Sequence, residues 1–227
     1  MKLGKNYKKV AELIKADKAY SIKEACELVK KTSTVKFDAT VDVSFHFNVD
    51  TTQADQQIRG TLILPNGNGK SKKICAITSK VEDAKAAGAD FVGGKEMIEK
   101  IVKENWFEFD VIVATPDMMG ELGKAARVLG PKGLMPNPKA GTVAPDIAKA
   151  IKEFKLGKVE YRLDKDANMH LSIGRVSFDA AKLSENLETL VGTLVRVRPA
   201  AVKGSYIKTA VVHTTMGPSI HFVFEGM

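Results

Sequence analysis

Residues 109–143 read FDVIVATPDMMGELGKAARVLGPKGLMPNPKAGTV and decide the fold of the middle of the chain. The apolar run 111–113 predicts a strand buried on both faces of a parallel sheet. Pro116 suits the first turn of a helix, and Asp117 brings negative charge to the positive end of that helix. Gly130 ends the predicted helix, and glycines and prolines restrict the shape of the loop that follows. This loop is either a scaffold corner or a presented surface, without a nucleophile, acid–base pair or metal-ligand cluster.

Short apolar strands and helices alternate around this segment. Strands are expected at residues 74–78, 91–92 and 111–113, and helices at 81–87, 96–104, 117–129 and 144–154. Such alternation predicts a small βα domain with a parallel sheet and right-handed crossovers.

The two ends of the chain show a two-residue period instead. Between residues 38 and 48, apolar residues alternate with polar ones, which predicts a strand with one core face and one accessible face. Further strands are expected at 58–64, 209–213 and 220–224, and a hairpin from 159–163 and 169–173, with His170, Ser172 and Gly174 on its polar face. Three helices are expected in the end segments. The first is 7–15, with Val10, Leu13 and Ile14 inward, and the second is opened by a Ser21–Glu24 capping box. The third is 178–195, with Asn186, Thr189 and Thr193 on its wetter side.

The composition is that of a globular protein with a moderate basic charge. The chain has 227 residues, 44% hydrophobic and 27% charged, with a formal net charge of +8. Basic charge favours a polyanionic partner, but here it is spread thinly and supports nucleic-acid binding only weakly. Cys26 and Cys75 are far apart and lack CxxC spacing, which favours two reduced, buried or half-buried thiols. No apolar stretch approaches the ~20 residues that cross a bilayer, and no secretory signal is present, so a cytoplasmic protein is expected.

The turn GNGKS at 67–71 resembles part of a phosphate-binding loop. A Walker A motif needs a glycine five residues before its Gly-Lys pair, where this chain has Leu64. It also needs a helix directly afterwards, where 74–78 predicts a strand. A flexible turn between domains is the better interpretation.

The histidines give no metal signature. His46, His170, His213 and His221 lie on different predicted strands, without the convergent spacing that a metal site needs. His170 is the best candidate for a ligand contact because Arg162, Lys165 and Ser172 share its hairpin, and such groups contact phosphates, ribose hydroxyls or base edges. The alternative is a merely solvated strand face.

Two loops of the end segments could bind RNA or serve structure alone. Lys36 and Phe37 precede the first long strand, where Phe37 is either an ordinary core residue or an aromatic that packs on ribose or base. The second loop contains Thr215, Met216 and Gly217, which form either a plain hairpin turn or a close backbone approach to a ligand.

Four runs of sequence carry a resemblance to a known family. ATPDMMG at 114–120 with LGPKGLMPNPKAGTV at 129–143 resembles the L-one family of bacterial large-subunit ribosomal proteins. The resemblance returns at DQQIRGTLILPNGNGK (55–70), YRLDKDANMHLSIG (161–174) and TTMGPS (214–219), and so covers essentially the whole chain in order.

The resemblance implies an α/β fold of two domains. Residues 1–67 and 158–227 would form a discontinuous α+β sandwich domain of the split β-α-β type, which binds RNA. Residues 68–157 would form an inserted Rossmann-like domain with a parallel sheet, whose Gly/Pro loop at 130–141 is chiefly scaffold and secondary RNA contact.

The resemblance also implies a function and a set of partners. The partners are the stalk region of 23S ribosomal RNA, tRNA that the protein helps to release from the exit site, and the messenger of the protein's own operon, which it would repress. The free protein would be a monomer. The RNA-binding residues carried over are Lys36, Phe37, Thr40, Lys165, His170, Ser172, Gly174, Thr215, Met216 and Gly217. No catalytic residue, metal or cofactor is expected.

Two competing classes remain open. A βα nucleotide-binding enzyme lacks a phosphate loop and an acid–base constellation in this sequence. A protein-only adaptor would show no RNA affinity.

Overall fold

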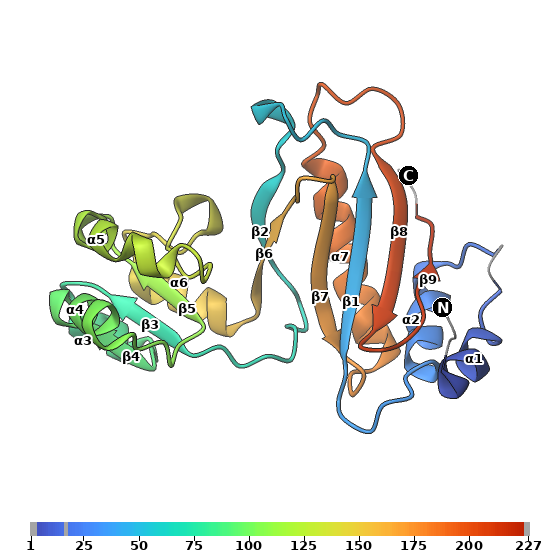
Figure 1. The fold of residues 1–227 in the computed structure, drawn as a ribbon, viewed down its shortest axis with the longest axis horizontal. Coiled ribbons are helices and arrows are strands. Elements are labelled where there is room, and N and C mark those ends of the chain that lie inside the picture. The colour runs from blue at the N-terminus through green and yellow to red at the C-terminus, as the bar shows by residue number, and fades with distance from the viewer. Residues whose placement is uncertain (1–3, 16–17, 225–227) are drawn as a thin grey trace. The chain divides into compact units, whose positions relative to one another are not determined.

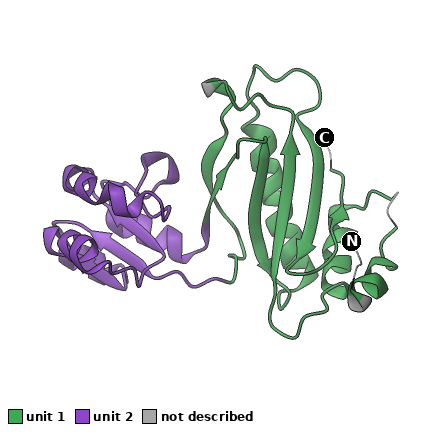
Figure 2. Ribbon diagram, viewed as in Figure 1, with its two compact units in different colours: residues 1–69, 159–227 green, residues 70–158 purple. Residues whose placement is uncertain are grey.

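The computed structural model describes residues 4–15 and 18–224. The chain divides into two compact units (Figure 2). Unit 1 is Met1–Gly69 with Val159–Met227, and unit 2 is Lys70–Lys158. The fold is of the mixed α/β class, with an antiparallel sheet in unit 1 and a parallel sheet in unit 2. None of the helices in the described ranges is long and apolar enough to span a membrane.

Unit 1 is built on a sheet with the strand order β7-β1-β8-β9. Its strands are β1 (Thr40–Phe47), β7 (Asn168–Arg175), β8 (Ile207–Thr214) and β9 (Ile220–His221), and its helices are α1 (Lys5–Ala11), α2 (Ile22–Lys31) and α7 (Ala180–Arg196). Strand β1 pairs antiparallel with both β7 and β8 and is therefore the centre of the sheet. Helices α2 and α7 share one hydrophobic core with the sheet, and in Figure 1 α7 lies behind β7 and β1. The opposite face of the sheet is turned toward the viewer.

The alternation predicted for the first long strand is confirmed. In β1 the residues Val41, Val43, Phe45 and Phe47 are all buried, and the residues between them are partly exposed. Strand geometry sends successive side chains to opposite faces, so the polar set lies on the face that the helices leave uncovered.

Helix α2 begins at the capping box that the sequence predicts. The Glu24 backbone N–H donates to Ser21 Oγ at 3.4 Å, and the Ser21 N–H donates to Glu24 Oε2 at 3.2 Å. Helix α1 is shorter than the predicted 7–15, and Leu13 is 55% exposed, so its inward assignment was wrong. The chain leaves the helix at Ala11, and the helical period no longer fixes the direction of the residues that follow.

The predicted hairpin of 159–163 with 169–173 is wrong. Strand β6 (Lys158–Arg162) pairs with β2 (Arg59–Ile63) in a separate two-stranded sheet, whereas β7 pairs with β1. Gly60 permits this pairing, because a Cβ there would lie 2.4 Å from the Tyr161 hydroxyl oxygen. A two-residue period identifies the faces of a strand but carries no information on its partner.

Asn186 also corrects the sequence interpretation, because it is fully buried rather than on the wetter side of α7. Its side-chain amide donates to the carbonyl oxygens of Gly67 at 2.9 Å and Ile173 at 2.8 Å. Its oxygen accepts the backbone N–H of Asn66 at 3.1 Å. A buried amide with satisfied partners is tolerated in a core, and this one fastens the 65–67 turn to α7.

Unit 2 contains the predicted parallel sheet, with the strand order β4-β3-β5. Its strands are β3 (Ile74–Ile77), β4 (Phe91–Gly93) and β5 (Val111–Ala114), and its helices are α3 (Val81–Ala86), α4 (Lys95–Glu104), α5 (Met119–Leu129) and α6 (Ile147–Lys155). Short 3-10 helices lie at Pro116–Met118 and Pro138–Ala140 in this unit, and at Ala54–Gln56 in unit 1. Helices α3 and α6 form a hydrophobic cluster with one face of the sheet, and α4 and α5 with the other.

The Gly/Pro loop after α5 is held by its own backbone geometry. Gly133 and Gly141 take left-handed conformations with φ of 71° and 62°, which glycine adopts without strain. Leu134 packs back against the core of α4 and α5. The Asn137 side chain accepts the Lys139 N–H at 2.8 Å, which starts the short helix there. These contacts give the loop a scaffold role.

Candidate nucleic-acid interface

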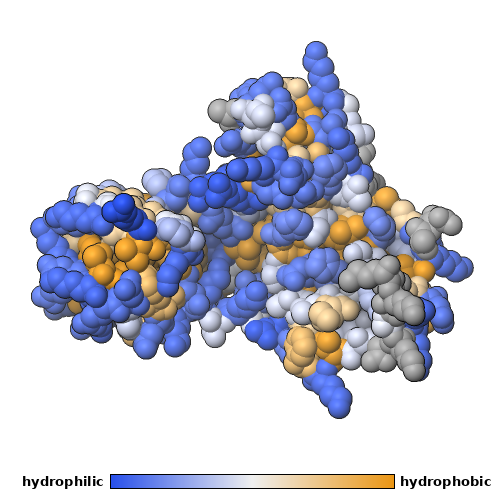
Figure 3. Space-filling view, in the orientation of Figure 1, coloured by the Kyte–Doolittle hydropathy of each residue, from blue (hydrophilic) through white to orange (hydrophobic). Residues whose placement is uncertain are grey.

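The candidate interface is the face of the unit 1 sheet opposite α2 and α7, together with the loops at its ends. Figure 3, drawn from the same side as Figure 1, shows hydrophilic residues over this face with apolar residues among them. The residues of this face come from three paired strands, β7, β1 and β8, so they form a continuous surface. We call it the sheet surface below.

At one end of the sheet surface, the first residue of β1 and the turn after β8 meet through a pair of threonines. The hydroxyl oxygens of Thr40 and Thr215 lie 3.0 Å apart, and the Thr215 N–H donates to the Thr40 carbonyl oxygen at 3.2 Å. Thr40 Oγ1 also donates to Asp42 Oδ2 at 3.0 Å. Because Thr40 has a single hydroxyl hydrogen, Thr215 is the donor between the two threonines. The Thr215 oxygen is left with lone pairs for an external donor such as a ribose 2′-hydroxyl.

The turn that follows Thr215 presents Met216 to solvent. Met216 is 77% exposed and has φ of 64°, a left-handed conformation that costs a non-glycine residue about 1 kcal/mol. Gly217 closes the turn by donating its N–H to the Thr214 carbonyl oxygen at 2.9 Å. A Cβ on Gly217 would lie 2.3 Å from Thr214 Oγ1, so glycine is required at this position.

Lys36 and Phe37 lie in the loop that enters β1 at the same end. Phe37 is 59% exposed, so its interpretation as an ordinary core residue was wrong. An apolar residue next to a lysine in a loop has the same sequence signature whether it is buried or exposed, so the pattern could not decide. Lys36 is exposed beside it.

The middle of the sheet surface is a chain of polar contacts across three strands. Ser44 Oγ lies 2.8 Å from His170 Nδ1 on β7 and 3.4 Å from His213 Nε2 on β8. A hydroxyl that donates to one imidazole and accepts from the other satisfies both contacts. The three side chains therefore form one ordered row, with His170 the most exposed of them.

Lys165 lies at the far end, in the turn before β7. Thr51 Oγ1 donates to the Lys165 carbonyl oxygen at 2.7 Å, and Asp164 Oδ1 accepts the N–H groups of Asp166 at 2.9 Å and Asn168 at 2.7 Å. These bonds fix the turn, and the Lys165 side chain is exposed. Its charge is thus available to a phosphate.

Ser172 and Gly174 occupy different faces of β7. Ser172 faces the sheet surface opposite Asp42, and its hydroxyl oxygen is buried without a hydrogen-bond partner in the described part of the chain. A register shift at Val41/Asp42 moves Gly174 to the core face, opposite Val41. The predicted alternation was wrong at Gly174, because a bulge adds one residue and reverses the face of all that follow. A Cβ there would lie 2.7 Å from Leu183 Cδ2, so this glycine serves packing against α7.

Other residues of the sheet surface were missed as candidates. Asp42, Ser44 and His213 carry its central contacts, and Arg175 braces its edge by donating to the Gly69 carbonyl oxygen at 3.0 Å. The alternation of β1 placed Asp42 and Ser44 on the polar face, which was the available signal. Their partners became visible only with the pairing of β1 to β7 and β8.

The structure supports the interpretation of 67–71 as a turn. Gly67 and Gly69 have φ of 66° and 71°, and the next regular element is strand β3 rather than a helix. The two cysteines are buried and unpaired, as predicted. Burial raises the pKa of Cys26 to about 11 and that of Cys75 to about 12, so neither is a nucleophile at neutral pH.

Comparison with known proteins places this sequence in a family. A sequence profile of the ribosomal protein L1p/L10e family matches residues 29–218, which include every candidate residue of the sheet surface. The chain belongs to the ribosomal protein L1p/L10e family. It is also similar to the large ribosomal subunit protein uL1 of Mesoplasma florum, with 56% identity over 220 residues, 96% of this chain and 97% of that protein.

Membership of the L1p/L10e family settles the class of the molecule. It is a ribosomal protein, a non-enzymatic constituent of the ribosome, and the bacterial ribosome lies in the cytoplasm. The nucleotide-binding enzyme considered from sequence is excluded as its function.

Proposed function

We propose that this protein, as a constituent of the large ribosomal subunit, binds ribosomal RNA through the sheet surface of unit 1. The observation that carries the proposal is the junction at which Thr40 and Thr215 meet, in loops that also hold the exposed side chains of Phe37 and Met216. Phe37 and Met216 are large apolar side chains exposed beside an ordered polar pair. Such exposed groups suit a recognition surface, whereas a core would bury them.

Each group has a distinct role in this proposal. Phe37 and Met216 pack on ribose or unstacked bases, and Thr215 accepts from a 2′-hydroxyl. Gly217 lets the backbone approach the RNA closely. Lys36 and Lys165 contact phosphates, while His170 and Ser172 contribute hydrogen bonds from β7. Gly174 acts indirectly by holding β7 on α7.

The surface favours a folded, non-helical RNA feature over a plain duplex. Its contacts are short polar groups and two apolar side chains, with few lysines, so shape and hydroxyl contacts dominate over phosphate neutralisation. In this proposal the feature is the stalk region of 23S ribosomal RNA. The motif resemblance supports that assignment, and Thr40, Thr215 and Met216 are the groups that read it.

Two further roles belong to the same proposal. A surface that reads RNA shape also binds a messenger that folds into the same shape, which would repress the protein's own operon. Residues 1–67 with 158–227 would act as the RNA-binding domain, the inserted domain at 68–157 would add a secondary RNA contact, and the whole protein would assist release of tRNA from the exit site. The free protein would be a monomer.

Filter binding to a stalk fragment of large-subunit ribosomal RNA tests the proposal, with an unrelated hairpin of equal length as control. We expect tight binding to the stalk fragment that persists across a salt series, since few phosphate contacts give a shallow salt slope. Equal binding to both RNAs that collapses steeply with salt would reduce the interaction to general basicity.

Variants assign the binding to the sheet surface. Thr215→Val and Met216→Asp should weaken stalk binding by about tenfold or more, as expected for a lost hydrogen bond or apolar contact in a recognition site. Thr189→Val on α7 and Val102→Asp on α4 make the same chemical changes elsewhere and should leave it unchanged. Unaltered affinity in folded Thr215→Val and Met216→Asp would remove the site from this surface.

A further inference from the structure

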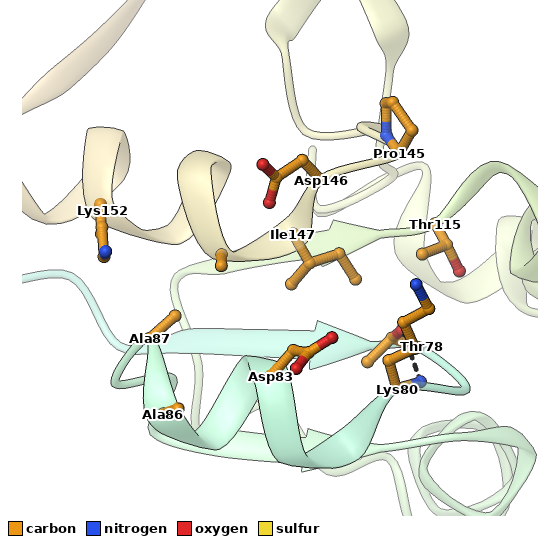
Figure 4. A pocket seen from close by; sticks show the side chains of 11 residues that line it. Thr78, Lys80, Asp83, Ala86, Ala87, Thr115, Pro145, Asp146, Ile147 and Lys152 are labelled. Carbon is orange, nitrogen blue, oxygen red and sulfur yellow. Dashed lines mark hydrogen bonds between the residues drawn. The ribbon is translucent and has the colours of Figure 1, made fainter.

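Unit 2 contains a cavity of about 410 Å³ at the carboxyl ends of strands β3 and β5. Figure 4 shows its lining side chains, which come from the segments after β3 and β5, from α3, and from the start of α6. The size lies within the range of small-molecule sites, ~300–1,000 Å³. Nothing in the RNA-binding proposal uses this cavity.

The topology of the sheet places the cavity where open α/β sheets bind ligands. Strand β3 is central, and the chain leaves it toward α3 on one face, whereas it leaves the neighbouring strand β5 toward α5 on the other face. The two connections diverge and leave a crevice between them. Ligands of open parallel sheets bind in such crevices, outside the carboxyl ends of the strands.

Thr115 gives the cavity an unused hydrogen-bonding group. It follows β5 directly, is only 8% exposed, and its Oγ1 has no hydrogen-bond partner in the part of the chain that the structure describes. The residue precedes the 3-10 helix Pro116–Met118, but its side chain does not cap that helix, because Met118 N–H donates to the Thr115 carbonyl oxygen instead. A buried hydroxyl without a partner costs stability. Its oxygen is closed off in this structure, so a ligand would satisfy it by drawing the Thr115 hydroxyl round into the cavity.

The charged groups of the cavity are balanced. Lys80 and Lys152 supply two positive charges, and Asp83 and Asp146 two negative ones. In Figure 4 the Lys80 side chain extends toward Thr115, while Lys152 lies at the opposite end with the carboxylates of Asp83 and Asp146 between them. This pattern gives the cavity no net formal charge, so it does not attract a polyanion. It suits a ligand with one anionic group next to several hydroxyl donors.

The remaining lining is mostly apolar. Ala86, Ala87, Pro145, Ile147 and Ala148 form it, together with Thr78, whose hydroxyl accepts the Lys80 N–H at 3.0 Å. Their side chains leave room for a flat group, and the N-terminus of α6 adds positive potential, although its cap Asp146 already accepts the Lys149 N–H at 3.2 Å. A cationic end, a central pair of hydroxyl acceptors and an apolar wall together match phosphate, ribose and base.

We propose that this cavity is a binding site for a ribonucleoside monophosphate, with no reaction catalysed there. The phosphate would accept from Thr115 Oγ1 and the Lys80 ammonium group, and the ribose hydroxyls would donate to Asp83 and Asp146. The base would lie along the alanines toward Lys152. The site belongs to unit 2 and is independent of the sheet surface of unit 1.

Isothermal titration calorimetry of the full chain with AMP, GMP, CMP and UMP tests the proposal. At least one nucleotide should bind saturably, more tightly than its 2′-deoxy form and than inorganic phosphate. Thr115→Val and Lys80→Gln should each weaken that binding about tenfold or more. Lys85→Gln, the same charge change on α3 outside the cavity, should not. Thr115→Val should keep or raise the melting temperature of the ligand-free protein, since it removes a buried hydroxyl that has no partner among the described residues.

Three results would overturn the proposal. One is the absence of saturable binding by all four nucleotides. Another is equal affinity for the ribo and deoxy forms together with unchanged binding by Thr115→Val and Lys80→Gln. The last is binding that is lost in Thr215→Val but kept in Thr115→Val, because the nucleotide would then occupy the RNA surface of unit 1. Stalk RNA affinity should be the same in Thr115→Val as in the unchanged protein.

Discussion

The hydroxyl groups of Thr40 and Thr215 lie 3.0 Å apart and join the start of β1 to the turn after β8, 175 residues away in sequence. Thr215 donates to Thr40, and Thr40 donates to the Asp42 carboxylate, so the three groups form one directed chain. In the proposed interface, such a chain orients the Thr215 oxygen before RNA binds. The ordering cost of binding is reduced accordingly.

A double-mutant cycle on this pair should show coupling. Thr40→Val and Thr215→Val each remove the shared hydrogen bond, so each should lower the free energy of unfolding by about 1 kcal/mol. The double variant should cost less than the sum, by about 0.5–1 kcal/mol, because the bond can be lost only once. Urea unfolding of the four proteins measures this, and strict additivity would show that the two hydroxyls do not interact in solution.

Met216→Gly should separate stability from RNA binding. Glycine adopts φ near 64° without the strain that methionine bears there, so the variant should gain up to about 1 kcal/mol of unfolding free energy. Its RNA affinity should fall, since the exposed thioether contact is lost. Urea unfolding and filter binding measure the two effects. A variant that is more stable and binds RNA equally well would remove Met216 from the interface.

Gly217→Ala should be destabilising for a different reason. The new Cβ would lie 2.3 Å from Thr214 Oγ1, a contact that forces the turn to shift at a cost of about 1–3 kcal/mol. Thr214→Ala removes that oxygen, which has no hydrogen-bond partner among the described residues. The double variant Thr214→Ala/Gly217→Ala should therefore recover part of the loss in thermal unfolding. No recovery would place the strain elsewhere in the turn.

Predictions from the sequence succeeded where a feature depends on neighbouring residues and failed where it depends on distant segments. The alternation from Val41 to Phe47 and the capping box at Ser21 each depend on neighbours in the chain, and both were found. The partner of β6 and the burial of Asn186 depend on distant segments, and both were mispredicted.

The sheet surface shows the same division. The turn at 215–217 was found from the sequence, but the row formed by Ser44, His170 and His213 requires the pairing of three strands. The face of Gly174 was missed because a single-residue bulge reverses the alternation without altering composition. Cross-strand partners and bulges are tertiary information that one sequence does not display.

A matched pair of glycine variants tests the position of Gly174 after the bulge. Gly174→Ala puts a Cβ 2.7 Å from Leu183 Cδ2 and 3.1 Å from Phe178 Cδ2, and should cost about 1–3 kcal/mol. Gly192→Ala lies in α7 with nothing within 4 Å of the new methyl group, and should gain about 0.5–1 kcal/mol from helix propensity. Thermal unfolding of both variants tests the assignment. A neutral Gly174→Ala would place this residue away from α7.

The two buried thiols predict a loss of stability at alkaline pH. Burial raises the pKa of Cys26 to about 11, against an opposing effect of the Ser184 hydrogen bond and with a smaller further increase from the Glu188 charge, and it raises that of Cys75 to about 12. The unfolded chain releases these protons near pH 9, whereas the folded chain keeps them. The stabilising contribution is therefore fully present below pH 9 and is lost as the pH rises toward 11 and 12.

Urea unfolding at pH 8, 9 and 10 measures this effect. Two thiols should lower the unfolding free energy by about 3 kcal/mol between pH 8 and 10. The variant Cys26→Ala/Cys75→Ala should show a shallower alkaline slope, with a remainder from Tyr206, whose phenol pKa burial also raises. Both thiols should resist Ellman's reagent at pH 8 until urea is added. Rapid reaction in the native protein, or an unchanged slope in the double variant, would contradict the burial of Cys26 and Cys75.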